Sequence, residues 1–448
     1  MKALYLADET RQNRLILHGE GVQPPVGSIQ RQPQPILRPD GLVEEVITIE
    51  CRGGGIWNFI TGLEARLALA RDGVTPLYLW LETDARLRPV GARVLTGRIE
   101  PLGGGTVDRA RGYQGLRLYL VRANWLAEGY GPLLLNNANG ANNITGLRLY
   151  NHADGDAGHV NFCDVRAEDI GGSQQTPARL VLQVESSPTR RLGRIVLGGG
   201  SNLGDAYGSY KHVLEGESAT AGADCTASTG VASEAASSGV YQNFQWTLTQ
   251  EAAVCRWTVS CEHLAWLAGR GLRPVARFHN PPQQQTRWRW KILAPDGGVV
   301  LDQSAQVLLD AASRLQVLPA VFPPVQSGQP PYQPFILEAW LENTTGGAKQ
   351  IDLDFIHLLP LENFNLLQPL GGLPAGHELT VDWINGQCYA EDSASGEKSI
   401  THRISGAPLM LRPGASQRLY VLYETDSGFP ISDSVKLRLQ AGPRWIEP

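Results

Sequence analysis

Two short stretches near the end of the chain decide the fold class. Residues 418–423 read Arg-Leu-Tyr-Val-Leu-Tyr, and residues 435–440 read Val-Lys-Leu-Arg-Leu-Gln. Side chains in both stretches fall into two alternating sets, which is the period of two that half-buried β-strands show. The turn-forming run Asp426–Pro430 between them predicts a hairpin with a wide turn. A Pro-Arg-Trp run at residues 443–445 is expected to end the pairing and to dock an aromatic ring.

The composition of the whole chain points the same way. The 448 residues include 50 glycines and 29 prolines, and only 19% of the residues are charged. This balance favours strands joined by many turns, and the length predicts about two to four domains. We therefore predict a mainly β protein. A formal charge of −5 argues against a general electrostatic affinity for nucleic acid.

The distribution of apolar residues predicts a soluble protein. The N-terminus lacks the apolar core of a secretion signal, and no later run approaches the roughly 18 apolar residues of a membrane span. We expect synthesis in the cytoplasm and no membrane insertion. Six cysteines without a Cys-x-x-Cys spacing argue against a zinc ribbon or a redox motif. Reduced thiols are expected, although a bridge among Cys225, Cys255 and Cys261 stays open.

One helix is predicted in the first third of the chain. Thr61 and Glu64 have the spacing of a capping box, and apolar residues recur at helical spacing until Asp72 and Gly73 end the segment. Strands are expected to follow at 77–82, 93–100 and 115–122. A single short helix beside these strands predicts a helix packed on a β-sheet or sandwich.

The order of these segments resembles the β-sandwich of tailed-bacteriophage tail proteins. The resemblance rests on the helix ending Arg-Leu-Ala-Leu-Ala-Arg at residues 66–71 and on the three strands after it, together with the closing stretch from residue 411 to residue 445. Distal tail and tail-tube proteins share a sandwich flanked by a helix. The resemblance implies a tail-protein-like sandwich built from both ends of the chain.

The middle of the chain has a different sequence pattern, with many short strand-like stretches separated by polar turns. We predict an N-terminal arm and tail-like sandwich over residues 1–130, a jelly-roll insertion of one or two lobes over 131–365, and a C-terminal module over 366–448 that completes the tail-like domain. A further boundary inside the insertion, near residue 190, stays open. Residues 219–239, rich in small and polar residues, are expected to form a mobile surface loop.

The insertion contains the candidate glycan contacts. Trp288 and Trp290 share one strand face, and such a pair can stack on a sugar ring; the alternative is that both fill the sandwich core. Glu215 and Glu217 resemble acids near the first strand of some carbohydrate-binding jelly rolls, where such acids can hold a structural calcium ion. These four residues are the candidate glycan contacts, and calcium is the one cofactor left open.

Other polar groupings favour structural explanations. The set His152, Asp154, Asp156 and His159 is more typical of a turn than of a metal site. Asp352 and Asp354 share one strand face, for which we predict exposure to solvent rather than paired acid–base chemistry. A glycine run at residues 198–200 lacks the Gly-Lys-Ser/Thr of a phosphate loop and is expected to be a loop. No catalytic residue and no metal ligand is assigned.

The resemblance leads to a functional expectation. It implies a non-enzymatic structural component of a phage tail or baseplate in the virion, assembling with other tail proteins as a ring of six-fold or three-fold symmetry around the tail axis. The Pro/Gln-rich arm at residues 30–39 would clasp a neighbouring subunit, and Arg444 and Trp445 are candidate interface residues. One alternative is a glycan-binding jelly roll used for attachment to a host surface. A β-sandwich hydrolase is another.

Overall fold

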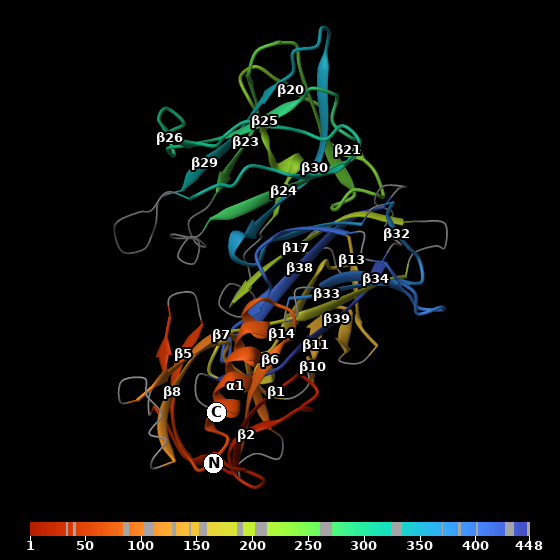
Figure 1. Cartoon of the computed structure of the whole chain (residues 1–448). Coiled ribbons are helices and arrows are strands. Elements are labelled where there is room, and N and C mark those ends of the chain that lie inside the picture. Colours follow the sequence, from red (N-terminus) through yellow and green to blue (C-terminus); the bar gives the residue numbers. More distant parts are fainter. Residues whose placement is uncertain are drawn as a thin grey trace. The chain divides into compact units, whose positions relative to one another are not determined.

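A computed structural model describes most of the chain. It covers residues 1–32, 35–38, 42–83, 89–102, 112–127, 131–142, 145–151, 159–185, 191–201, 213–259, 271–323, 334–369, 371–383, 387–399, 402–425 and 434–445. The described residues are mainly β, as predicted, and contain one α-helix (Figure 1). They fall into two compact units. Unit 1 comprises residues 1–131, 171–176 and 442–448, and unit 2 comprises residues 132–170 and 177–441.

Unit 1 is built on one antiparallel sheet. The main path of this sheet runs β2-β1-β6-β7-β8-β5-β3, while β4 pairs with β5, and β9 pairs with both β7 and β40. Its strands are β1 (Ala3–Ala7), β2 (Leu15–His18), β3 (Val26–Arg31), β4 (Ile36–Leu37), β5 (Val43–Arg52), β6 (Leu77–Glu82), β7 (Val90–Pro101), β8 (Tyr113–Arg122), β9 (Trp125–Ala127) and β40 (Arg444–Trp445). The three strands predicted after the helix are confirmed as β6, β7 and β8.

Helix α1 (Ile56–Arg71) packs against the sheet of unit 1. Its buried side chains include Leu63 and Leu67, which join the core of the unit. Asp72 is the C-cap after the last helical residue, as predicted, and Gly73 follows with φ 71°. The predicted capping box is wrong, because the N-cap is Gly55, six residues before Thr61, and no side chain caps the helix. A Thr-x-x-Glu pattern also occurs inside helices, so the spacing alone did not mark the start.

The first sandwich of unit 2 combines residues 132–170 and 177–201 with residues 365–441. One sheet contains β13 (Leu147–Tyr150), β16 (Arg179–Val184), β33 (His377–Asp382), β34 (Gln387–Asp392), β35 (Lys398–Ser399) and β39 (Ser434–Ala441). The other contains β11 (Leu135–Asn137), β12 (Gly140–Asn142), β14 (Phe162–Val165), β17 (Arg191–Ser201), β31 (Asn365–Pro369), β32 (Leu373–Pro374), β36 (His402–Gly406) and β38 (Gln417–Thr425). Shorter elements are β10 (Gly131–Pro132), β15 (Thr176–Pro177), β37 (Met410–Leu411), η1 (Ala167–Asp169) and η4 (Leu361–Asn363).

The second sandwich of unit 2, residues 213–360, is inserted between β17 and β31. Its first sheet contains β18 (Val213–Glu215), β20 (Thr226–Ala227), β21 (Val231–Ala232), β22 (Val240–Trp246), β24 (Leu272–Phe278), β28 (Leu315–Val317) and β30 (Lys349–Pro360). Its second sheet contains β19 (Thr220–Ala221), β23 (Ala252–Val259), β25 (Arg287–Leu293), β26 (Val300–Gln303), β27 (Val307–Leu308) and β29 (Phe335–Glu342). A short turn, η2 (Gly216–Ser218), follows β18. Figure 1 shows this sandwich in green and cyan.

The predicted C-terminal hairpin is wrong. Strand β38 pairs with β14 and β17, whereas β39 pairs with β13 and β16, so the two strands belong to the two different sheets of the first sandwich. Both contribute alternate side chains to one core, among them Val421 and Leu437. The period of two identified each strand correctly, but it carries no information on the partner strand. The loop at residues 426–433 lies outside the described residues.

Two further expectations differ from the structure. Gly199 does not lie in a loop but in β17, where it pairs with Leu419. A Cβ at this position would come within 2.4 Å of the carbonyl oxygen of Arg418, so glycine is needed for the close approach of the strands. Strand pairing also groups the chain differently from the predicted segments, since residues 365–441 complete a sandwich with residues 132–170 and 177–201.

The predictions on cysteine residues and membrane spans can be compared with the structure. Among the residues described, five cysteines are free thiols: Cys51, Cys163, Cys225, Cys255 and Cys388. Cys261 lies outside the described residues, as do His152, Asp154 and Asp156. None of the helices in the described part of the chain is long and apolar enough to cross a membrane.

Candidate functional site

The two tryptophans predicted as glycan contacts are buried. The exposed fractions of Trp288 and Trp290 are 0% and 1%, and the two rings contact each other edge to face with centroids 5.0 Å apart. Trp257 and Phe278 complete this aromatic cluster in the core of the second sandwich. Trp288 and Trp290 therefore cannot stack on a glycan in this structure. The alternative explanation, that both fill the core, is the correct one.

Glu215 and Glu217 lie at the end of β18 and in the turn after it. The carbonyl oxygen of Glu215 accepts a hydrogen bond of 3.0 Å from Nε1 of Trp257, and the carboxylate of Glu217 accepts one from Oγ of Ser238. Within the described ranges, no three His, Cys, Asp or Glu side chains gather as a metal site would require. A role for Glu215 and Glu217 in glycan binding or calcium binding stays a prediction.

A buried carboxylate on the outer face of the first sheet of this sandwich organises a polar surface. Asp352 on β30 is only 6% exposed. Its Oδ1 accepts a hydrogen bond of 2.6 Å from Nδ2 of Asn243, and its Oδ2 accepts one of 2.7 Å from Nδ2 of Asn280. Gln245 Nε2 donates to Oδ1 of Asn243 at 2.8 Å. A carboxylate can only accept, so Asp352 fixes the orientation of both amides.

Strand geometry explains why these residues meet. Positions 241, 243 and 245 alternate along β22 with the buried Phe244 and Trp246, so they point away from the core. Asn243 lies directly opposite Asp352 in the pairing of β22 with β30. The end of β24 brings His279 beside them, because its backbone N–H donates to the carbonyl oxygen of Asp352 at 2.8 Å.

An aromatic pair lies next to this network. The rings of Tyr241 and His279 stack with centroids 4.1 Å apart and planes 8° from parallel, and both residues are partly exposed. Neither ring nitrogen of His279 has a hydrogen-bond partner among the described residues. We call this surface the Asp352 face and define it by six residues: Tyr241, Asn243, Gln245, His279, Asn280 and Asp352.

Protonation states on the Asp352 face follow from its partial burial. Burial lowers the pKa of His279 below its ordinary value, despite the opposing effect of the Asp352 and Asp354 charges. His279 is therefore neutral at pH 7, with one ring nitrogen donating and the other accepting. Burial, and then the charge of Asp352, raise the pKa of Tyr241, so its hydroxyl stays protonated. The rings of Tyr241 and His279 thus offer neutral donors and acceptors.

Asp354, two residues along β30, has a structural role. It is 1% exposed and pairs with Arg277, and its Oδ1 accepts a hydrogen bond of 2.9 Å from the backbone N–H of Ser237. Arg277 also donates to the carbonyl oxygen of Ala235 at 3.1 Å. The expectation that Asp352 and Asp354 lie on a solvated face is wrong, because both are buried: Asn243 and Asn280 bond Asp352, and Ser237 lies against Asp354. Ser237 belongs to residues 219–239, which were predicted to form a mobile loop but include β21, which pairs with β22.

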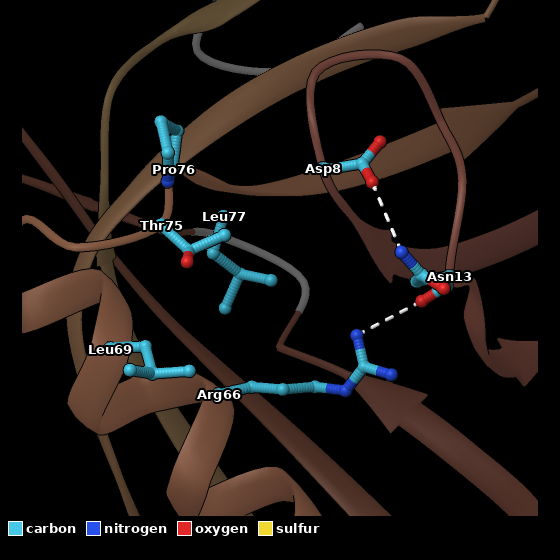
Figure 2. A pocket seen from close by; sticks show the side chains of 7 residues that line it. All are labelled: Asp8, Asn13, Arg66, Leu69, Thr75, Pro76 and Leu77. Atoms are coloured by element: carbon cyan, nitrogen blue, oxygen red, sulfur yellow. Dashed lines mark hydrogen bonds between the residues drawn. The ribbon is translucent and has the colours of Figure 1, made fainter.

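Unit 1 contains a pocket of about 320 Å³ between α1, the loop after β1 and the start of β6. Figure 2 shows Arg66 extending from α1 toward Asn13, and its Nη1 donates to the carbonyl oxygen of Asn13 at 2.9 Å. Asp8 lies in the same loop. Hydrogen bonds lower the pKa of its carboxyl group, and the bond from Thr10 has the largest effect. These polar groups hold the loop in place, so we assign no ligand to this pocket.

The C-terminal candidates Arg444 and Trp445 form β40 in unit 1. Their backbones pair with Leu126 and Trp125 of β9. The carbonyl oxygen of Arg444 also accepts hydrogen bonds from the backbone N–H groups of Ser173 and Gln174, at 2.8 and 3.1 Å. The backbones of Arg444 and Trp445 are therefore held in a sheet. The side chain of Trp445 lies outside the described atoms, and its docking stays a prediction.

Comparison with known proteins adds little to this geometry. No protein-family model matches the chain, and no curated protein matches it. Among solved structures, a family 35 carbohydrate binding module from Clostridium thermocellum is similar to part of the chain. The similarity has 15% sequence identity and a TM-score of 0.19, and it covers 33% of this chain and 97% of that chain. A TM-score this low carries no argument about a ligand, so function must be argued from the site.

Proposed function

We propose that this protein binds a glycan, without catalysis, through the Asp352 face. The observation that carries the proposal is the Tyr241–His279 stack beside two amides held by one buried carboxylate. A partly exposed aromatic ring can cover the apolar C–H face of a sugar. Amide and imidazole groups of fixed orientation can bond its hydroxyls, which both donate and accept.

The network is organised before any ligand arrives. Asp352 holds the Nδ2 atoms of Asn243 and Asn280, which leaves the oxygen of the Asn280 side chain directed away from the carboxylate. A ligand hydroxyl could donate to this oxygen without disturbing the buried bonds. Because the polar groups are already ordered, binding would require little loss of side-chain entropy.

Binding without chemistry is the better proposal for this face. Glycoside hydrolysis uses two carboxyl groups on opposite sides of the scissile bond. Here both oxygens of Asp352 accept amide hydrogen bonds, and Asp354 is buried against Arg277. Neither carboxyl group is placed to reach a sugar, so the hydrolase alternative has no support on this surface.

A glycan array with the full chain tests the proposal, followed by isothermal titration of the best ligand. Replacing Tyr241 by Ala should weaken binding by about fivefold to tenfold, since an aromatic contact contributes roughly 1 kcal/mol. Asn280→Ala should weaken it similarly. Tyr113→Ala, which removes an exposed tyrosine in unit 1, is the matched control and should bind normally. Equal affinity of Tyr241→Ala and the unchanged protein would refute the site.

A structural role in a phage tail or baseplate is the second candidate, and one observation in unit 1 favours assembly. Ile36 and Leu37 of β4 are 56% and 46% exposed, and they belong to the arm expected to clasp a neighbour. An Ile36→Asp, Leu37→Asp double variant should reduce the mass measured by light scattering if this arm joins subunits in a ring. A monomer at high concentration, absent from purified virions, would rule this role out.

A further inference from the structure

A second pocket, of about 380 Å³, lies in unit 2 between the two sandwiches of that unit. Strand β17 and the end of β38 supply one side, and the turn at residues 312–314 supplies the other. Three arginines line it: Arg191, Arg194 and Arg314. Pockets between packed lobes are common ligand sites, because walls from two elements can surround a small molecule.

The arginines are fixed by backbone contacts that leave donors available. Nη1 of Arg191 donates to the carbonyl oxygen of Gly371 at 3.0 Å, and Nε of Arg314 donates to that of His279 at 3.2 Å. Within the described part of the chain, neither guanidinium pairs with a carboxylate. Each has further N–H groups, since arginine carries five donors. Arg194 differs, because its Nη2 pairs with Asp310 at 2.8 Å.

The carboxylate in the lining does not neutralise these two side chains directly. Glu424 is 8% exposed, and its oxygens accept hydrogen bonds from the backbone N–H of Arg314 at 2.7 Å and from Oγ of Ser313. It is therefore engaged by neutral donors that anchor the turn. Three guanidinium groups against Glu424 and the Asp310 that pairs with Arg194 leave one net positive charge at the pocket.

The backbone of β17 is also irregular at this place. Its pairing with β38 shifts register between Leu192 and Arg194, which makes Gly193 the extra residue of a β-bulge. Gly193 lines the pocket. Bulges redirect neighbouring side chains and occur often beside binding sites. Positions 191 and 194 would point to opposite faces of a regular strand, and the bulge between them interrupts this alternation.

We propose that this pocket binds an oxyanion, the phosphate or carboxylate group of a small molecule. The planar guanidinium groups of Arg191 and Arg314 bond such oxygens in a fork geometry, and their positive charge attracts the anion. Arg194 is already paired with Asp310, so the proposal rests on Arg191 and Arg314. The site lies on different side chains from the Asp352 face, so it goes beyond the proposed glycan function.

Titration calorimetry tests the proposal, with inorganic phosphate in one experiment and citrate in another. Both are run at constant ionic strength with chloride as the background anion. We expect saturable binding of at least one of the two, and the comparison shows which oxyanion the site takes. Arg191→Gln and Arg314→Gln should each weaken binding about tenfold or more, because each removes a charge-assisted hydrogen-bond donor. Arg287→Gln, at an exposed arginine on β25, is the control and should leave binding unchanged.

Three outcomes would overturn the site. One is no binding of phosphate or citrate above the chloride background. Another is unchanged affinity in Arg191→Gln, a variant at an exposed side chain that tests the pocket even if Arg314→Gln fails to fold. The third is an equal loss in Arg287→Gln, which would indicate non-specific charge attraction. Arg314→Lys adds a check on geometry, since it keeps the charge and loses the fork, and it should bind more weakly than the unchanged protein.

Discussion

Asn243 and Asp352 lie directly opposite each other on β22 and β30, with Nδ2 of the amide 2.6 Å from Oδ1 of the carboxylate. This pair, completed by Asn280, places an ordered polar surface on a sheet whose other face is apolar core. The same carboxylate thus supports both the fold and the proposed ligand surface.

Replacing Asp352 by Ala should therefore lower both the stability of the fold and the affinity for a glycan. The Nδ2 groups of Asn243 and Asn280 would lose their acceptor, and an unsatisfied or reoriented amide costs roughly 1 to 3 kcal/mol. Urea unfolding should show this loss, and glycan affinity should fall with it. Asp302→Ala, at an exposed aspartate on β26, is the control and should change neither. Normal stability and normal binding in Asp352→Ala would contradict the anchoring role.

Glycan affinity should depend on pH through His279. Its pKa is lowered by burial, so the ring is neutral from pH 8 down to its ordinary value of about 6.5 and becomes protonated only below that. Protonation removes the acceptor nitrogen and adds charge beside Asp352, Asp354, Arg277 and Arg314. We expect constant affinity between about pH 8 and pH 7, and weaker binding only as the pH falls below the ordinary value through the lowered pKa of His279. A His279→Gln variant should lack this acid dependence in titration calorimetry.

Stability should fall in mild acid because of His357. This residue is 0% exposed in the core, and burial lowers its pKa to about 3. Below pH 6.5 the unfolded chain takes up a proton that the folded chain refuses, so stability is lost as pH falls, by about 1.4 kcal/mol per unit. Between pH 7 and pH 5, urea unfolding should show about 2 kcal/mol more loss in the natural protein than in His357→Phe. Equal pH dependence of the two proteins would contradict this.

Deleting residues 443–448 should destabilise unit 1. The deletion removes β40, its pairing with β9, and the carbonyl of Arg444 that accepts from Ser173 and Gln174. Each lost backbone hydrogen bond contributes about 1 kcal/mol, so the loss should be roughly 2 kcal/mol or more. Thermal unfolding measures it, and light scattering shows whether assembly depends on Trp445. An unchanged melting temperature would show that the chain end is dispensable.

Local sequence pattern was sufficient for much of the secondary structure. The strand at Leu77–Glu82 and the C-cap of α1 at Asp72 follow from alternation and from a helix-ending glycine. The pairing of β38 and β39 could not be predicted, because the same alternation suits a hairpin and two facing sheets. Strand register and pairing across long connections depend on tertiary contacts, so a short stretch of sequence does not predict them.

The site was harder to predict than the fold. Asp352 and Asp354 alternate with apolar residues, which is the pattern of a solvated face, yet tertiary contacts bury both carboxylates. Only the tertiary packing shows this burial. The tryptophan pair drew attention because large aromatic residues suit glycans, but Trp288 and Trp290 suit a core equally well. Tyr241 and His279 are 38 positions apart in sequence, and no local motif joins them.

A structure of the full chain with its best array glycan tests the central claim most directly. The account predicts a sugar ring against Tyr241 or His279, with a hydroxyl donating to the side-chain oxygen of Asn280 and with Asp352 still bonded to both amides. A glycan bound elsewhere on the chain, with the Asp352 face empty, would contradict it.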